Sequence, residues 1–377
     1  MPARRARPAT GEDGRAAQAR QPTVVGVREL HDAPLAPLTT LRLGGPARRL
    51  VEATTDTEVI ETVRDADRRG EPLLILAGGS NIVIGDQGFD GTVLRIATTG
   101  VVLDGTHLEL AAGEVWNDAV TRTVQAGLAG IECLAGIPGS AGATPIQNVG
   151  AYGQEVSSTI THVTAYDRRT GTTVTLAGDE CGFSYRHSRF KDDPGRYVIL
   201  RVGYRLEDAG GLSAPLRYAE VAHALGVEQG ERVPAAAARE AVLRLRAGKG
   251  MVLDPADHDT WSAGSFFTNP VLDADQYRAF LDRVRERLGP DAQPPAYPAP
   301  DGMTKTSAAW LIDKAGFTKG YGSGPARIST KHTLALTNRG AAKTEDLLAL
   351  AREVRDGVRE AFGVELVNEP VMVGVSL

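Results

Sequence analysis

The sequence predicts an α+β protein built from α/β subdomains with several mixed sheets. Short apolar runs alternate with amphipathic helical stretches from residue 42 onward, and glycine-rich breaks separate many of them. No internal repeat is visible, which argues against a solenoid. With 377 residues of ordinary globular composition, the chain is long enough for two or three packed domains.

Strands and two helices alternate through the first half of the chain. Strands are expected at the apolar runs 48–53, 72–77, 92–96, 107–112, 161–166, 172–176 and 198–204. Residues 57–69 carry apolar side chains at helical spacing, which predicts a helix. A second helix is expected over residues 114–126, with Gly127 after its end.

The second half begins with an Ala- and Arg-rich helix over residues 234–246. The glycines on either side of Lys249 break the chain there, and we interpret this break as a domain boundary. Beyond it the pattern predicts a helix at 307–314, a strand at 333–336 and a helix at 345–362. Five apolar residues on one face of this last helix form its expected buried stripe: Leu347, Leu350, Val354, Val358 and Phe362.

Charge and cysteine content restrict the function classes. The net charge of −5 gives no support to nucleic-acid binding, which favours a basic surface. The two cysteines, Cys133 and Cys181, lack metal-ligand spacing, so we expect no metal site and a reducing compartment. Residues 1–21 are Arg-rich without an apolar run, which predicts a disordered tail and neither a signal peptide nor a membrane span. We therefore expect a cytoplasmic protein.

Two glycine-rich loops are candidates for a phosphate-containing ligand, at residues 78–81 and 136–153. Backbone N–H groups can approach a phosphate closely where no Cβ intervenes. Neither loop has the Walker or the dinucleotide fingerprint, and the first on its own is more typical of a tight turn. The second is long and contains Gln147 and Asn148, whose amides suit the edge of a planar heterocycle, with Tyr152 expected to pack nearby.

Seven short motifs occur in one order along the chain: GGSN at 78–81, IPGS at 137–140, PIQNVGAYG at 145–153, YRHS at 185–188, AGSFFTNP at 263–270, WLID at 310–313 and NEP at 368–370. This ordered set, from about residue 39 to 374, resembles the UDP-N-acetylenolpyruvoylglucosamine reductase (UDP-N-acetylmuramate dehydrogenase) family, in its subgroup with a substrate-closing tyrosine loop. The resemblance implies a two-subdomain FAD-binding unit of the vanillyl-alcohol oxidase type and a C-terminal substrate-binding α+β domain. The expected ranges are 22–98 and 99–247 for the FAD-binding subdomains and 248–377 for the substrate domain, whose last strand is expected to pack back on the FAD unit.

The resemblance also implies a reaction. NADPH reduces FAD, and hydride then passes to C3 of the enolpyruvyl group of a UDP-sugar, giving UDP-N-acetylmuramate for peptidoglycan synthesis. Ser265 matches the family's general acid, which protonates C2, and Arg186 matches the arginine that contacts the enolpyruvyl carboxylate. Glu369 matches the glutamate that completes the catalytic set. Without the motifs, these residues would be read as a turn serine, a surface arginine and a solvated carboxylate.

Further site residues follow from the same motifs. The expected cofactor contacts are Gly78, Gly79, Ser80, Asn81, Ile137, Gly139, Ser140, Gln147, Asn148, Gly150, Ala151, Tyr152 and Gly153. The expected substrate contacts are Tyr185, Tyr218, Lys249, Asn269 and His332. The chain departs from the family twice: the phosphate-binding lysine is expected near Met251, where Lys249 is the nearest candidate, and Val367 stands where an acid is common.

Two other functions remain open at this point. One is a different FAD-dependent oxidoreductase of the same superfamily, in which flavin is often attached through His or Cys; Cys133 lies just outside the second loop. The other is a non-catalytic binder of a nucleotide sugar. A yellow purified protein would exclude a binder without flavin, and NADPH oxidation that depends on the UDP-enolpyruvyl sugar would identify the substrate. No obligatory protein partner is expected.

Overall fold

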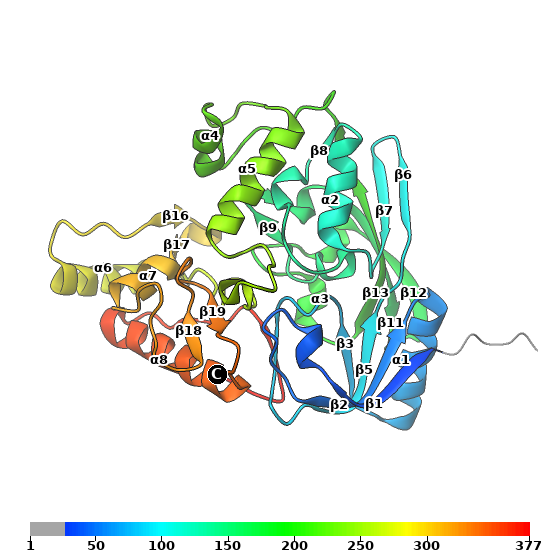
Figure 1. Cartoon of the computed structure of the whole chain (residues 1–377). Helices are drawn as coiled ribbons and strands as arrows, with labels where there is room; N and C mark the ends of the chain where they lie inside the picture. The colour runs from blue at the N-terminus through cyan, green and yellow to red at the C-terminus, as the bar shows by residue number, and fades with distance from the viewer. Residues whose placement is uncertain (1–26) are drawn as a thin grey trace, which may run out of the picture.

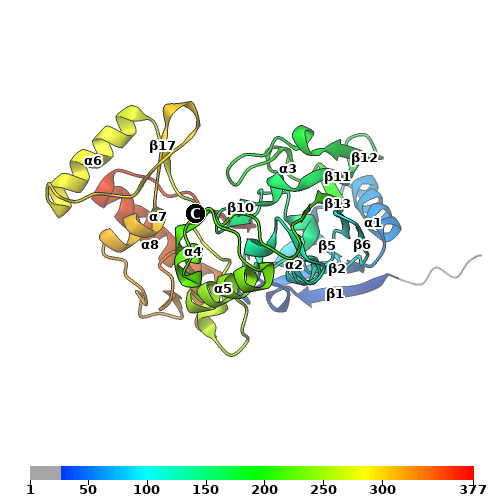
Figure 2. The ribbon, with the colours of Figure 1, turned by 90° about the horizontal axis from the view of Figure 1, so that it is seen from above.

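The computed structural model describes residues 27–377, and the tail predicted for residues 1–21 lies outside them. Figure 1 shows an N-terminal sheet in blue, a second sheet in cyan and green beside it, and a C-terminal part in orange and red on the opposite side. Seen from above, the ribbon of the C-terminal part lies to one side of the two sheets, with α4 and α5 next to it (Figure 2). Within residues 27–377, no helix is both long enough and apolar enough to cross a membrane.

The first sheet has four strands in the order β1 (Arg28–Pro34), β2 (Pro46–Ala53), β5 (Phe89–Ile96) and β3 (Leu73–Leu76). β2, β5 and β3 run parallel, and β1 is antiparallel to β2. Helix α1 (Asp56–Arg69) connects β2 to β3 and buries Val59 and Val63. A capping box at Thr55 begins this helix and Gly70, with φ of 60°, ends it, so the helix predicted at 57–69 is confirmed.

The second sheet is antiparallel, in the order β12 (Thr172–Ala177), β11 (Ile160–Asp167), β13 (Tyr197–Arg205), β7 (His107–Ala111) and β6 (Val101–Asp104). Helices α2 (Trp116–Gln125) and α5 (Ala235–Gly248) pack into the same core. That core also contains Val51 and Leu94 of the first sheet, so the two sheets share one apolar interior. The predicted strands in both sheets are confirmed.

The C-terminal part has a separate core, into which helices α6 (Ala274–Leu288), α7 (Ala308–Lys314) and α8 (Thr344–Phe362) pack. Its small sheets contain β15 (Val271–Leu272), β17 (Thr304–Thr306) and β16 (Ala296–Pro298), and β18 (Ala326–Ile328) with β19 (Leu336–Asn338). The buried stripe predicted for α8 is confirmed, since all five of its residues are buried. The strand predicted at 333–336 is wrong, because the chain turns between His332 and Ala335 and β19 begins only at Leu336.

The chain's last strand returns to its N-terminal half. β20 (Val371–Val373) pairs in parallel with β4 (Ile82–Ile84), which directly follows the first glycine-rich loop. The remaining strands and α-helices of the described residues are short: β8 (Leu128–Ala129), β9 (Gly150–Ala151), β10 (Gln154–Glu155), α3 (Arg189–Asp192), β14 (Glu207–Asp208) and α4 (Ala219–Leu225). The β20–β4 pairing brings residues from both ends of the sequence to one site.

Candidate functional site

The two glycine-rich loops pack backbone against backbone. A Cβ added to Gly78 would lie 2.6 Å from the Cα of Gly139, which is too close for any side chain. Gly139 has φ of +123°, a conformation that only glycine adopts without strain. The Ser80 hydroxyl donates a hydrogen bond to the carbonyl of Pro138 at 2.9 Å and ties the loops together. Glycine is therefore required in both loops by their close approach.

These loops line a cavity of about 340 Å³. Ten of the thirteen predicted cofactor residues lie in its wall: Gly78, Gly79, Ser80, Asn81, Ile137, Gly139, Ser140, Gln147, Gly150 and Ala151. Ser265, Arg186 and Glu369, the predicted catalytic residues, lie in the same wall. The structure thus brings together three catalytic candidates that are separated by up to 183 positions in the sequence.

Three predicted cofactor residues lie outside this wall. The Asn148 side chain is 1% exposed and is occupied by hydrogen bonds with Glu155, the carbonyl of Ser184 and the amide of Ser157. Tyr152 packs edge-on against another tyrosine, and a Cβ on Gly153 would meet the backbone of the loop before α4. Asn148 therefore braces the second loop from behind instead of offering its amide to the cavity.

The cavity wall suits a flat heteroaromatic group joined to phosphates. Leu74, Ile75 and Trp116 supply apolar surface, and the glycines leave backbone N–H groups uncovered by side chains. The hydroxyl of Ser140 is buried and has no hydrogen-bond partner within the described residues, although buried polar groups are nearly always paired. An unpaired donor in such a wall fits FAD, whose phosphates and ring edge offer acceptors.

Gly79→Ala tests whether the loop geometry holds the cofactor. Gly79 has φ of +61°, and a Cβ there would lie 2.0 Å from the carbonyl oxygen of Leu38. We expect the variant to lose about 1–3 kcal/mol of stability through backbone strain and displacement of the loop. Thermal unfolding and the flavin absorbance retained after gel filtration measure both effects. Gly70→Ala is the control, because its φ is 60° but its added Cβ meets no atom within 4 Å; equal flavin loss in both variants would contradict this role for the loop.

Arg186 and Glu369 face each other inside the cavity. The Arg186 Nε lies 3.8 Å from the Glu369 Oε1, and the Gln147 amide donates a hydrogen bond to the same oxygen at 3.3 Å. Asn81 in turn donates to the Gln147 carbonyl oxygen at 2.7 Å. The two loops and the C-terminal segment therefore form one polar network.

Burial raises the pKa of Glu369 above its ordinary value, and the positive charges of Arg186 and Lys191 offset part of that rise. Arg186 has φ of 55°, a strained conformation for a residue with a side chain. Its guanidinium donates to the carbonyl oxygens of Asn148 and Gly150 at 3.2 and 2.6 Å. The structure thus fixes this cation beside a carboxylate whose charge depends on it.

Ser265 is held between two anchored segments. The next residues, Phe266 and Phe267, are each 1% exposed in the C-terminal core. The amide of Phe266 donates to the carbonyl of Leu334, and its carbonyl accepts from the amide of Glu369 at 2.9 Å. The buried phenylalanines therefore leave Ser265 at the cavity wall beside the segment that carries Glu369.

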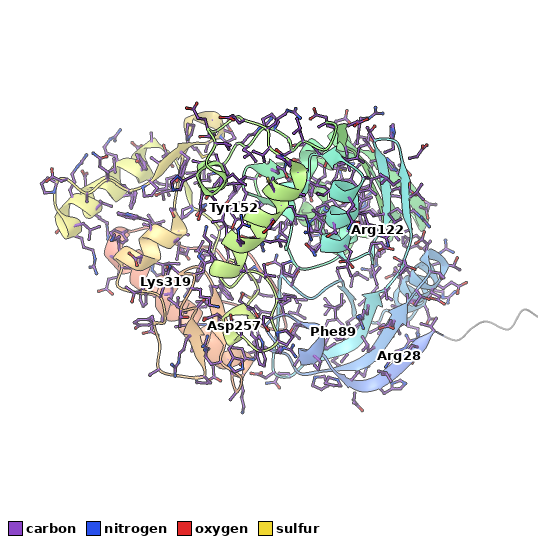
Figure 3. The ribbon with its side chains drawn as sticks, turned by 45° about the horizontal axis from the view of Figure 1, so that its top comes forward. Arg28, Phe89, Arg122, Tyr152, Asp257 and Lys319 are labelled. Atoms are coloured by element: carbon purple, nitrogen blue, oxygen red, sulfur yellow. The ribbon has the colours of Figure 1, made fainter. Side chains whose placement is uncertain are left out.

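The predicted substrate residues form two groups. Tyr218 packs edge-on against Tyr152, and the Lys249 ammonium lies 5.6 Å from the Tyr152 ring centre (Figure 3 labels Tyr152, beside α5). Burial and the nearby lysines lower the pKa of His332 to about 4, so this imidazole is neutral at pH 7. Tyr185 and Asn269 line a separate cavity of about 680 Å³, which shares Arg186 with the first.

Sequence reasoning missed two charged residues of the first cavity wall, Lys191 and Arg246. Lys191 belongs to both cavities and donates to the Arg186 carbonyl at 3.1 Å. Its position five residues after Arg186 was the available signal. Met251, where the family lysine was expected, lines the cofactor cavity, whereas Lys249 lies in the group with Tyr218.

Comparisons with known proteins agree with this geometry. Residues 254–373 match the family model described as UDP-N-acetylenolpyruvoylglucosamine reductase, C-terminal domain, and residues 47–177 match an FAD binding domain. Relatives named UDP-N-acetylenolpyruvoylglucosamine reductase include one from Streptomyces avermitilis, 78% identical over 94% of this chain and 98% of its own length, and one from Thermobifida fusca, 58% identical over 92% and 98%. The crystal structure of UDP-N-acetylenolpyruvylglucosamine reductase from Thermus caldophilus aligns with a TM-score of 0.62 at 26% identity, covering 92% of this chain and 99% of that one. The chain belongs to the UDP-N-acetylenolpyruvoylglucosamine reductase family.

Proposed function

We propose that the chain catalyses the NADPH-dependent, FAD-mediated reduction of UDP-N-acetylglucosamine enolpyruvate to UDP-N-acetylmuramate, a precursor of peptidoglycan. The observation that carries this proposal is the meeting of Ser265, Arg186 and Glu369 in the wall that both glycine loops line. The test is NADPH oxidation by the flavin-loaded protein with and without the UDP-enolpyruvyl sugar. Flavin-loaded protein that oxidises no NADPH in the presence of the sugar would contradict the proposal.

FAD would be held by the two glycine loops. When bound, it would supply the group that accepts hydride from NADPH and passes it on to C3 of the enolpyruvyl group. The wall residues exclude water and fix the ligand's orientation. Ser140 would donate its unpaired hydroxyl proton to an acceptor on the cofactor. The Ser80 hydroxyl is already engaged with Pro138, so we assign it to holding the loops together.

Arg186 would bind the carboxylate of the enolpyruvyl group. Hydride addition at C3 develops negative charge at C2, which the attached carboxylate delocalises, so a fixed cation there stabilises the transition state more than the ground state. A guanidinium that is held in place by two backbone carbonyls requires little reorganisation to do this. Ser265 would then protonate C2, and Glu369 would orient Arg186 and complete the polar network.

Cys133 is not suited to forming a covalent bond with flavin, which was one feature of the alternative oxidase function. Its thiol is buried outside the cavity wall, and burial next to Glu132 raises its pKa to about 12. A thiol that stays protonated is a poor nucleophile. We therefore propose non-covalent FAD, which acid precipitation should release fully into the supernatant.

Lys249→Met tests the substrate end. Lys249 is bonded to Glu220 at 2.7 Å and lies beside Tyr152 and Tyr218, where we propose that it meets the substrate diphosphate. Because the charge acts equally in the ground and transition states, we expect KM for the sugar to rise about 10-fold with kcat changed little, as for one charge-assisted hydrogen bond. Steady-state kinetics measure this split. Lys319→Met, at another lysine near His332, is the control, and an unchanged KM in Lys249→Met would refute the contact.

We also propose the domain division 22–98, 99–247 and 248–377, with one sheet or group of small sheets in each part as support. The return of β20 to β4 makes the C-terminal end part of the first unit. We place the reaction in the cytoplasm, because it consumes NADPH and a nucleotide sugar and both cysteines are free. The proposed function requires the UDP-sugar, NADPH and FAD, and we propose no obligatory protein partner.

A further inference from the structure

Glu155 is a carboxylate beside Arg186 that the proposed reaction does not yet use. It lies in β10, directly opposite Gly150 of β9, and belongs to neither of the two cavity walls described above. One of its carboxylate oxygens accepts a hydrogen bond from the Asn148 side-chain amide at 3.1 Å, and the other lies 3.9 Å from the Arg186 Nη1. The carboxylate therefore links the second glycine-rich loop to the guanidinium of Arg186 without lining either cavity.

The lack of a side chain at Gly150 permits this arrangement. A Cβ added there would lie 2.7 Å from the Glu155 Cγ, closer than side chains can approach, and 3.0 Å from the Arg186 Nη1. The carbonyl of Gly150 also accepts a hydrogen bond from Arg186 at 2.6 Å. Glycine at this position thus leaves the space in which the carboxylate and the guanidinium meet.

Asn148 extends the contact to the backbone that carries Arg186. Its side-chain amide also donates to the carbonyl of Ser184 at 3.1 Å, and its own carbonyl accepts from the guanidinium at 3.2 Å. Ser184 and His187 exchange two backbone hydrogen bonds, which close the turn in which Arg186 has its positive φ of 55°. Asn148 and Glu155 therefore restrain both the backbone turn and the side chain of Arg186.

The guanidinium lies between two carboxylates in different environments. Its Nε is 3.8 Å from Glu369, which is 14% exposed inside the cavity, whereas Glu155 is 41% exposed. Water screens the charge of Glu155, so its direct attraction for the guanidinium contributes little. The hydrogen bond to Asn148 contributes in another way, because it fixes the orientation of the group that accepts from Arg186.

We propose that Glu155 is a positioning residue, which through Asn148 holds the guanidinium of Arg186 in the plane where it binds the enolpyruvyl carboxylate. A bidentate contact needs a guanidinium that is fixed in its plane. Because negative charge on the substrate grows during hydride addition, a loosely held cation costs more in the transition state than in the ground state. The inference rests on the proposed function and adds to it a residue that touches neither substrate nor cofactor.

The test uses stopped-flow absorbance of the flavin-loaded protein. We expect Glu155→Ala to slow reoxidation of reduced flavin by the UDP-enolpyruvyl sugar about tenfold, as for one charge-assisted hydrogen bond, and to raise the sugar's dissociation constant less than about threefold. Flavin reduction by NADPH should keep its wild-type rate. Glu155→Gln retains an oxygen that can accept from Asn148, so its reoxidation should stay within about threefold of wild type. Glu109→Gln is the matched control, because Glu109 is 37% exposed and lies 3.6 Å from an arginine but lines neither cavity; it should keep both rates.

A double variant separates positioning from a general effect on the fold. If Glu155 acts through Arg186, its removal changes little once the guanidinium is absent. Arg186→Ala and the double variant Arg186→Ala with Glu155→Ala should therefore reoxidise flavin within about twofold of each other. A purely structural residue would slow reoxidation by the same factor in both backgrounds, and this result would overturn the inference.

Three further results would also overturn it. A wild-type reoxidation rate in Glu155→Ala would show that the carboxylate is not needed. An equal fall in flavin reduction by NADPH would assign the effect to the loop that holds the cofactor. An equal fall in Glu109→Gln would show that loss of any surface carboxylate acts in the same way. These outcomes all require a wild type that the sugar reoxidises, whereas a wild type that holds flavin and is not reoxidised refutes the proposed function, and this inference with it.

Discussion

Ser265→Ala leaves the reduction of bound flavin by NADPH at its wild-type rate and slows reoxidation by the UDP-enolpyruvyl sugar by about 10²–10⁴-fold, the usual contribution of a general acid. The first half-reaction needs no proton from the protein. In the second, C2 becomes strongly basic as hydride arrives at C3, and the serine hydroxyl is the donor that we propose. A serine is a weak acid in water, so it serves only because its partner is so basic and the wall excludes solvent.

Stopped-flow absorbance of the flavin separates the two half-reactions. Ser262→Ala is the matched control, since Ser262 lies three residues earlier and its hydroxyl accepts a hydrogen bond from the Gly264 amide without lining the cavity. We expect this control to lose some stability and to keep both rates. If Ser265→Ala slowed flavin reduction as much as reoxidation, the serine would act on the cofactor and not as the acid.

The sequence predicted those elements whose signal is local. Helix α8 combines a long apolar stripe with acidic residues in its first turn and Gly363 at its end, so its bounds came within one residue. Helix α6 was missed, although it has a capping box at Asp273, because only Phe280 and Val284 of its face are buried. Its remaining residues are mostly charged or polar, and a narrow stripe of this kind is hard to distinguish from a solvated loop.

Pairings between distant segments were not accessible in the same way. The pairing of β20 with β4 joins residues nearly 290 positions apart, and no periodicity in one sequence encodes it; only the family resemblance led us to expect the last strand on the FAD unit. The motifs indicated that Glu369 belongs to the site, but not that its backbone amide bonds to Phe266. Asn148 is an example of the opposite kind. Its amide suggested a ligand contact, whereas in the fold it forms hydrogen bonds with the carbonyl of Ser184 and the amide of Ser157, outside the second loop.

Arg246 shows why a residue of the cavity wall can be missed in a helix. In the sequence it ends an Ala- and Arg-rich segment in which three arginines occur within eight residues, as on an ordinary solvated helix. Only the tertiary contacts separate it from Arg244, which pairs with Glu240 at the surface. Burial, and not residue type or spacing, distinguishes the two, and burial depends on the loop that follows the helix.

Arg186→Ala should lower kcat/KM for the UDP-sugar by about 10²–10³-fold, with effects on both KM and kcat. Removing a charge-assisted, two-pronged contact costs about 1.5–3 kcal/mol for the bound carboxylate, and more as negative charge develops during hydride transfer. The same change also leaves Glu369 without its nearest cation, 3.8 Å away, so the pKa of this buried carboxyl should rise further. Activity in the variant should therefore fall off at a higher pH on the acid side than in wild type.

Arg186→Lys separates charge from geometry. The lysine keeps a positive charge near Glu369 but cannot donate to the carbonyls of Asn148 and Gly150 while also gripping a carboxylate with two parallel bonds. We therefore expect it to restore the acid limb of the pH profile and only part of kcat/KM. Titration of the oxidised flavin's absorbance with the sugar gives the dissociation constant directly. An unchanged dissociation constant in Arg186→Ala would show that the guanidinium does not bind the substrate's carboxylate, because removing it would then have cost the complex nothing.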